Sequence, residues 1–194
     1  MKIILFLLIF SMGFVPMSQI TAQETFVWDA SPSGEPENPP EPIPRQFREL
    51  SLGMALDDLK SALTRDSLFR FRGDRDVSFL PIRAETLVET TGSSYIRRAF
   101  FQLSDGAVFI MSFSLDTRRM DHYSVFTSFV DKYGQPLALS PAEAVWETDE
   151  TRVSIERPLT VKYIDKMVFD RLTEESKTRE AREIVRREEF LADF

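Results

Sequence analysis

Two nine-residue runs with the pattern of β-strands, separated by an Asp-Gly turn, constrain the fold of this chain more than any other feature. The runs are residues 95–103 and 107–115, and Asp105-Gly106 lies between them. Asp-Gly suits the tight turn of a two-residue β-hairpin. In the second run, apolar residues alternate with more polar ones: Phe109, Met111, Phe113 and Leu115 against Ser112 and Ser114. The pattern predicts an antiparallel hairpin with one buried face.

Two other segments have helical spacing. Residues 55–63 and 120–133 repeat apolar side chains every three or four positions. The positions concerned are Leu56, Leu59 and Leu63 in the first segment, and Tyr123, Phe126, Phe129, Val130 and Tyr133 in the second. Asp121 is a suitable N-cap for the second helix, and Gly134, with Pro136 two residues later, is a stop signal. We therefore expect two amphipathic helices.

Shorter patterns complete the expected order of elements. The further predicted strands are residues 68–72, 77–81, 142–146, 153–156 and 159–164. A charged C-terminal helix follows from Lys166, with Val168, Leu172, Ile184 and Val185 as candidates to dock on the core. The order suggests two unequal copies of a helix followed by three strands. The fold class predicted is α+β: an antiparallel β-meander with helices on one face and a charged C-terminal helix.

The N-terminus has the pattern of an export signal. Lys2 is followed by an apolar run over residues 3–10, and a more polar stretch ends at Ala22. A membrane-spanning helix needs about 20 apolar residues, which is more than Pro16, Ser18 and Gln19 leave here. We expect cleavage after Ala22 and a periplasmic or secreted protein without stable membrane insertion. An uncleaved anchor is the alternative.

The composition divides the whole chain into four segments. Residues 1–22 are the predicted signal peptide, residues 23–45 a Pro-rich acidic linker, residues 46–165 the α+β domain and residues 166–194 a helical extension. The linker has the composition of an extended polyproline II spacer. Removing residues 23–44 is therefore expected to leave the stability of the domain nearly unchanged.

Composition excludes several kinds of function. The chain has no Cys, which excludes disulfides, thiolate metal sites, a Cys nucleophile and a lipid-modified Cys. Its formal net charge is -7, so it has no general attraction for nucleic acid or anionic membranes. We expect no nucleic-acid partner.

The sequence contains no defensible catalytic, cofactor or metal motif. His122 is the one His, and a surface position beside Asp121 is the expected role for it. Asp74 and Asp76 lie in a polar turn without the remaining ligands of a calcium loop. Gly-x-Ser-x-Gly is absent, and Gly92-Ser93-Ser94 reads as a loop. We therefore assign no catalytic, cofactor-binding or metal-binding residue.

Basic and aromatic residues interleave in two places. These are Phe69-Arg70-Phe71-Arg72, and Arg97-Arg98 beside Phe100-Phe101. A stacking platform for nucleic acid or sugar is one interpretation. Half-buried strands with Phe inward and Arg outward are the expected one, because the chain is acidic and carries an export signal.

Two stretches resemble known families. Residues 52–63, Leu-Gly-Met-Ala-Leu-Asp-Asp-Leu-Lys-Ser-Ala-Leu, resemble the opening helix of SmpA/OmlA-type outer-membrane assembly lipoproteins. This opening is also similar to that of the tandem modules of β-lactamase inhibitor proteins. Lys132-Tyr-Gly-Gln-Pro136 with Trp146 downstream resembles a pattern of exported bacterial proteins. The resemblance implies a helix followed by a β-meander. It carries over no functional residue. A lipid-anchored role like that of the SmpA/OmlA-type lipoproteins would need a Cys to carry the lipid, and this chain has none.

Three functions remain open at this point. The first is a non-enzymatic interaction module that binds another envelope protein. The second is a periplasmic small-ligand-binding domain with an aromatic-lined pocket, and the third is an enzyme that uses carboxylates. A pocket between sheet and helices would favour the ligand binder, a flat sheet with an exposed apolar patch the interaction module, and two buried carboxylates in a pocket the enzyme.

Overall fold

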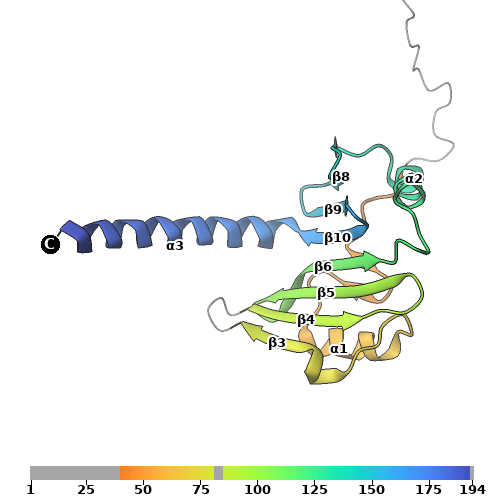
Figure 1. Ribbon diagram of the computed structural model, residues 1–194, viewed down its shortest axis with the longest axis horizontal. Coiled ribbons are helices and arrows are strands. Elements are labelled where there is room, and N and C mark those ends of the chain that lie inside the picture. The colour runs from red at the N-terminus through yellow and green to blue at the C-terminus, as the bar shows by residue number, and fades with distance from the viewer. Residues whose placement is uncertain (1–39, 81–84, 193–194) are drawn as a thin grey trace, which may run out of the picture. The chain divides into compact units, whose positions relative to one another are not determined.

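The computed structural model describes residues 40–80 and 85–192 and has an α+β fold (Figure 1). The predicted signal peptide and most of the predicted linker lie outside these residues. The helical elements are α1 (Leu56–Arg65), η1 (Gly73–Asp76), α2 (His122–Tyr133) and α3 (Lys166–Ala192). The strands are β1 (Gln46–Phe47), β2 (Leu50–Ser51), β3 (Val77–Leu80), β4 (Glu85–Thr91), β5 (Ile96–Ser104), β6 (Ala107–Leu115), β7 (Ala138–Leu139), β8 (Glu143–Glu147), β9 (Thr151–Glu156) and β10 (Thr160–Asp165).

Two antiparallel meanders join edge to edge in the large sheet. Its strand order within the described residues is β3-β4-β5-β6-β10-β9-β8-β7. The last strand of each meander therefore pairs with the last strand of the other, with Val161 opposite Phe113 and Tyr163 opposite Met111. Each meander follows a helix, α1 or α2, and has four strands rather than the three that we predicted. The additional strands are β4, whose pattern we had not recognised, and the short β7.

The predicted hairpin is confirmed as β5 and β6, but with one difference in which side chains face the core. Asp105 and Gly106 both have positive φ, 51° and 79°, as the turn requires. The register then shifts, so that Gln102 pairs with Ile110 and Leu103 with Val108. The extra residue in β6 is Phe109, and it packs with Ile110 in a second cluster instead of beside Met111. Alternation alone gave the wrong face for Phe109.

The main core lies on the face of the sheet that carries α1 and α2. Leu59, Ala62 and Leu63 of α1 and Val125 of α2 belong to the same buried cluster as the inward side chains of the strands. The residues of the large sheet in that cluster are Val88, Ile96, Ala99, Phe101, Leu103, Val108, Met111, Phe113, Ala144, Trp146, Val153, Ile155, Val161 and Tyr163. Helices on one face of an antiparallel sheet, as predicted, thus bury one continuous core.

Residues 68–72, which we predicted as a strand, are irregular. Their backbone pairing is a single bridge, between Phe69 and Gly92. Two of their backbone N–H groups donate to carboxylates instead of a strand: Leu68 to Asp66 at 2.9 Å and Arg72 to Asp76 at 3.0 Å. These local bonds compete with the ladder, although Phe69 still faces the core.

Helix α2 has the predicted boundaries and fixes Trp146. The side chain of Asp121 accepts a hydrogen bond from the Ser124 N–H at 2.8 Å, and Gly134 ends the helix with φ +77°. Trp146 is 2 % exposed and donates its Nε1–H to the Gly134 carbonyl at 2.8 Å. Its ring packs against Phe126 and Phe129, with centroids 6.0 and 5.3 Å away. The predicted docking of Trp146 beneath this helix is confirmed.

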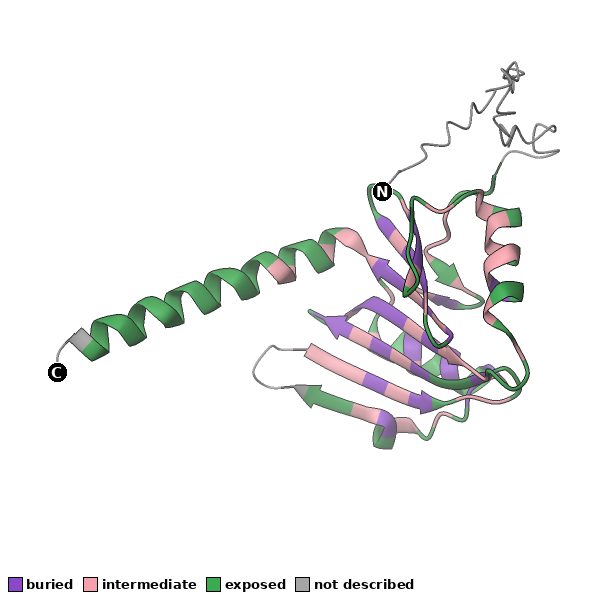
Figure 2. Ribbon diagram, turned by 45° about the horizontal axis from the view of Figure 1, so that its top comes forward, coloured by how far each residue is buried: buried purple, intermediate pink, exposed green. Residues whose placement is uncertain are grey.

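Helix α3 meets the sheet only through its first turns. Val168 and Leu172 pack on the cluster of Phe109, Ile110 and Ile164, as predicted. Ile184 and Val185 are about half exposed, 52 % and 51 %, so the prediction that they dock on the core was wrong (Figure 2). None of the helices described here is long and apolar enough to cross a membrane.

The residues just before β1 contact the body. The Glu41 N–H donates to the Lys132 carbonyl at 2.7 Å, and Ile43 packs against the main core. Arg45 pairs with Asp165 and donates to Thr151 Oγ1 at 3.1 Å. The end of the predicted linker therefore belongs physically to the domain.

Candidate functional site

A groove of about 660 Å³ opens on the helix-bearing face of the sheet, beside α2. We name it the aromatic groove, because rings from the strands, from β1 and from α2 line it. Its lining residues are Phe47, Leu68, Tyr95, Ile96, Phe113, Leu115, Arg119, Met120, Asp121, Ser124, Val125, Ser128, Phe129, Val161 and Tyr163. Its size and mostly apolar lining are typical of small-molecule sites, which occupy roughly 300–1,000 Å³.

The pairing of β6 with β10 builds the floor of the groove. Phe113 and Val161 are register partners on these strands, and both are almost fully buried. Tyr163, two residues further along β10, packs edge-on against Phe113 with ring centroids 6.1 Å apart. Val125 and Phe129 of α2 form one wall. Phe47 of β1 also lines the groove and packs on Phe113, with ring centroids 4.5 Å apart. The site therefore needs both meanders.

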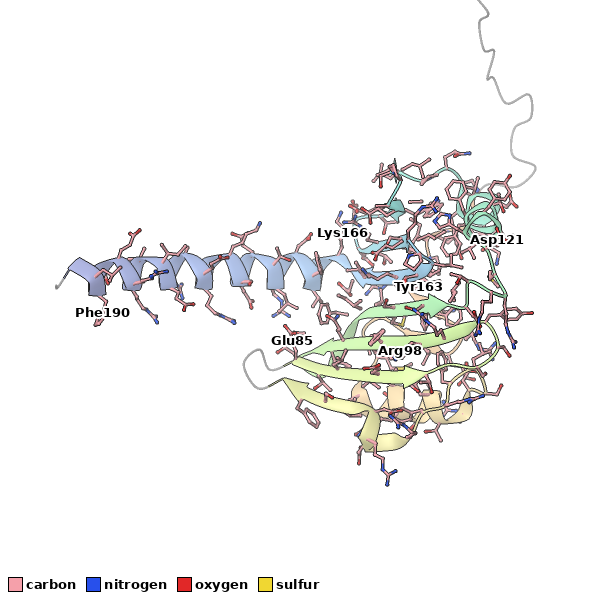
Figure 3. The ribbon with its side chains drawn as sticks, viewed as in Figure 1. Glu85, Arg98, Asp121, Tyr163, Lys166 and Phe190 are labelled. Atoms are coloured by element: carbon pink, nitrogen blue, oxygen red, sulfur yellow. The ribbon has the colours of Figure 1, made fainter. Side chains whose placement is uncertain are left out.

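Tyr163 contributes the buried polar group of the groove (Figure 3). It is 5 % exposed, and its hydroxyl has no hydrogen-bond partner among the residues that the structure describes. Every fully buried side-chain nitrogen or oxygen there does have one, so the Tyr163 hydroxyl remains accessible from the groove. Burial, with a smaller effect from nearby Tyr133, raises the pKa of Tyr163 well above its usual value. At neutral pH it is therefore a hydrogen-bond donor.

The loop between β6 and α2 places charged groups at the mouth. Asp116 accepts hydrogen bonds from Arg118 Nε and Nη2, both at 3.0 Å, which lowers the pKa of Asp116 to about 2. Arg119 lies 4.0 Å from the same carboxylate. Asp121 accepts from the Ser124 N–H and from its hydroxyl at 2.6 Å, and these bonds lower the pKa of Asp121. Both acids are therefore ionised and already bonded at neutral pH.

A second cavity, of about 440 Å³, lies on the opposite face of the sheet. Gln102, Ser112, Arg152, Ser154, Glu156 and Lys162 form its polar part, and Leu87, Phe100, Ile110, Ile164 and Phe169 its apolar part. Lys162 Nζ donates to both oxygens of Glu156 at 2.6 and 2.8 Å. Arg152 lies 3.9 Å from Glu147. The charges of this face thus pair with one another, and it is smaller and more polar than the aromatic groove.

The candidate site residues Asp74, Asp76 and His122 each have a defined place in the structure. Asp76 is buried and accepts hydrogen bonds from the backbone and the side chain of Arg72, whereas Asp74 pairs with Lys60 at 2.8 Å. His122 is the first residue of α2 and is half buried. No group of three His, Cys, Asp or Glu side chains suited to a metal ion occurs in ranges 40–80 and 85–192.

The two basic and aromatic stretches do not form a common platform. Phe69 and Phe101 are both buried and pack edge-on, with centroids 6.3 Å apart, in the core. Arg97 and Arg98 are exposed, and the Arg98 guanidinium lies 5.9 Å from the ring centre of Phe100. In β5 the interpretation with inward Phe and outward Arg holds for Phe101, whereas Phe100 lies on the other face of the sheet beside Arg98.

Comparison with protein-family models matches residues 45–175 to the TP0088 domain. The chain belongs to the TP0088 domain family. The matched TP0088 domain begins at Arg45, which bonds to β9 and β10, and ends in the part of α3 that follows the sheet contacts. It therefore contains the whole aromatic groove. Neither the search of curated proteins nor the search of solved structures found a match.

No local pattern in the sequence marks the groove of this TP0088 domain. Its walls come from five separated segments around Phe47, Leu68, Tyr95, residues 113–129 and residues 161–163. The abundance of aromatic residues on predicted strands was consistent with such a pocket. The pairing of β6 with β10, which brings the segments together, could not be read from periodicity.

Proposed function

We propose that this chain is an exported, non-enzymatic binding domain whose aromatic groove holds a small, mainly apolar ligand. The groove itself is the observation that carries the proposal: about 660 Å³, aromatic-lined, between α2 and the sheet. A pocket at this position distinguishes a ligand binder from an interaction module. The accessible, unbonded hydroxyl of Tyr163 adds the fixed polar group that such sites use to orient a ligand.

Export remains part of the proposal. Its support is the predicted signal peptide over residues 1–22, with cleavage after Ala22 and a periplasmic or secreted mature protein. N-terminal sequencing of the protein from the envelope fraction should give Gln23 as the first residue. Recovery of intact Met1 in a form that requires detergent would contradict it.

Binding of a neutral apolar dye tests the groove directly. N-phenyl-1-naphthylamine emits strongly only in apolar surroundings, and its emission should rise and saturate with the mature protein. Ser128 lines the groove from the exposed side of α2, so Ser128→Trp should fill the groove without removing any core contact. We expect this variant to bind the dye at least about tenfold more weakly, which corresponds to a loss of roughly 1.4 kcal/mol.

Asp131→Trp is the matched control. Asp131 is also exposed on α2, three residues further along, and it does not line the groove. It should bind the dye as the parent does. Circular dichroism melting shows whether each variant is folded. A parent protein that does not enhance dye emission, or a folded Ser128→Trp variant that binds like the parent, would refute the proposed site.

A second candidate function is an interaction module for another envelope protein. The observation that favours it is a set of large apolar side chains exposed on the later turns of α3, among them Ile184 at 52 %, Val185 at 51 % and Leu191 at 57 %. Apolar side chains gathered on a charged helix are a common contact surface for a partner.

Site-specific crosslinking separates the two candidates. A photoreactive residue at Val185 should crosslink to one defined protein in the intact envelope, whereas one at exposed Glu183, on the opposite side of the same helix, should do so less. Equal, diffuse crosslinking from both positions would count against the interaction module. The dye experiment is unaffected by this result, because α3 does not line the aromatic groove.

A further inference from the structure

Arg119 is the cation at the mouth of the aromatic groove. Its backbone N–H and that of Met120 both donate to the Asp116 carbonyl, at 2.9 and 3.0 Å, so the position of the residue is fixed by a turn. Its guanidinium makes no hydrogen bond with the residues described here, and the nearest carboxylate oxygen, on Asp116, is 4.0 Å away. Arg119 therefore has N–H donors free for a ligand.

The two acids near Arg119 are already satisfied. Arg118 holds Asp116 through two side-chain bonds of 3.0 Å and a backbone bond of 3.1 Å. Asp121 caps α2 through the N–H and the hydroxyl of Ser124. A carboxylate that already accepts two or more hydrogen bonds attracts a cationic ligand less than an unbonded one does. The start of α2 also presents the positive end of its helix dipole at this place.

The interior of the groove is apolar with one donor. Phe113, Val161 and Phe129 offer surface to a hydrocarbon or ring system, and the Tyr163 hydroxyl is the polar group among them. Apolar interior and cationic mouth together match a ligand that has an apolar body and an anionic end.

We propose that the ligand of the aromatic groove is an amphipathic carboxylate, whose apolar body lies on Phe113, Val161 and Phe129 and whose carboxylate pairs with Arg119. The inference rests on the proposed function, because it names the ligand class of the same site. An Arg guanidinium suits this ligand, since its planar N–H donors can bond both oxygens of a carboxylate.

Three probes with the same twelve-carbon chain and different ends test the ligand class. Dodecanoate, dodecanol and dodecyltrimethylammonium are each used below the concentration at which they aggregate, and each competes with N-phenyl-1-naphthylamine for the mature protein. We expect dodecanoate to bind tightest and the ammonium probe weakest. Arg119→Gln should weaken dodecanoate about tenfold, as expected for one charge-assisted hydrogen-bonded pair, and leave dodecanol unchanged.

Two further variants make the result specific. Arg119→Lys keeps the charge and should retain part of the preference for dodecanoate over dodecanol. Arg97→Gln makes the same charge change at an exposed residue of β5 that does not line the groove, and should have no effect. Circular dichroism melting shows whether Arg119→Gln is folded, and the ratio of its dodecanoate and dodecanol affinities isolates the effect on the carboxylate.

The outcomes separate this inference from the proposed function. Failure of the parent to bind the dye or any of the three probes would overturn both. Dye binding with equal affinities for the three probes, or a preference for dodecyltrimethylammonium, would overturn the carboxylate assignment and leave the groove as a ligand site. A dodecanoate preference that survives in Arg119→Gln would overturn the role of Arg119.

Discussion

Trp146 connects helix α2 to the second meander through one hydrogen bond and two ring contacts. Trp146→Ala should lower the free energy of unfolding by about 3–5 kcal/mol, through lost burial and the cavity that remains. Trp146→Phe keeps a ring but removes the donor to the Gly134 carbonyl, and should cost about 1–3 kcal/mol. Urea unfolding followed by circular dichroism measures both.

Fluorescence gives an independent check on Trp146. In a Trp28→Phe background it is the one indole left in the chain, and its emission should be blue-shifted and poorly quenched by acrylamide. Ready quenching, together with a thermally silent Trp146→Ala, would contradict its place in the core.

Asp116 gives the stability of the groove mouth a defined pH dependence. The bonds from Arg118 lower its pKa from 3.8 to about 2 in the folded protein. A lowered pKa means that the stabilisation is fully present above pH 4 and is lost as the pH falls from about 4 towards 2. The difference in melting temperature between the parent and Asp116→Asn should therefore be largest at pH 5 and shrink towards pH 2.

Arg118→Gln removes the partner of the same pair and should give the same pH trend. A melting difference that stays constant between pH 5 and pH 2, for both variants, would show that the Asp116–Arg118 contact contributes nothing through its charge.

Among the elements, α3 combines a docked start with exposed later turns. A chain that ends at Glu175, the last residue of the TP0088 domain match, should melt within about 2 °C of the parent, because residues 176–191 are exposed.

Leu172→Ala is the contrasting change. Leu172 packs on Phe109 and Ile110, and its loss should cost about 1–2 kcal/mol, less than for a fully buried Leu. A large drop in the truncated chain would mean that the later turns support the domain.

The elements predicted best are those whose signal is local. Asp121, Gly134 and the apolar stripe between them define α2 within the helix itself, and Asp105-Gly106 defines its own hairpin. Strand β4, Glu-Thr-Leu-Val-Glu-Thr-Thr, was not predicted because Leu87 and Val88 are adjacent, so neither face alternates clearly. It forms because β5 pairs with it along its whole length.

At the scale of the whole molecule, the start of the domain can be located by deletion. Removing residues 23–39 should leave the melting temperature nearly unchanged, since the stretch is Pro-rich and acidic with few apolar residues. Extending the deletion to residue 44 should cost about 1–2 kcal/mol, because Ile43 packs on the core and Glu41 bonds to the end of α2. This changes the expectation from sequence for residues 23–44. Equal melting of the two deletions would place the boundary after Pro44.

The groove shows where prediction from this sequence ends. The fold class could be predicted from the spacing of apolar residues in each segment and from the order of the predicted helices and strands. The site depends on Phe113 and Val161 becoming neighbours, and nothing local to either strand specifies that partner. Arg119 is equally inconspicuous in the sequence, as one Arg of a pair, and it became a candidate only through its place at the mouth.

The pairing of β6 with β10 also sets an order of events during folding. Ser114 and Thr160 face each other across this pair and are 46 residues apart in the chain, so the pairing closes a long loop. Contacts of such separation slow folding, because the entropy of closing the loop is lost before they form. Until β10 arrives, β6 is an unpaired edge strand rich in apolar residues, the kind of edge that aggregates. The second meander is thus the cover that the first one requires, and a nascent chain that stops before Thr160 would leave that edge open to other chains.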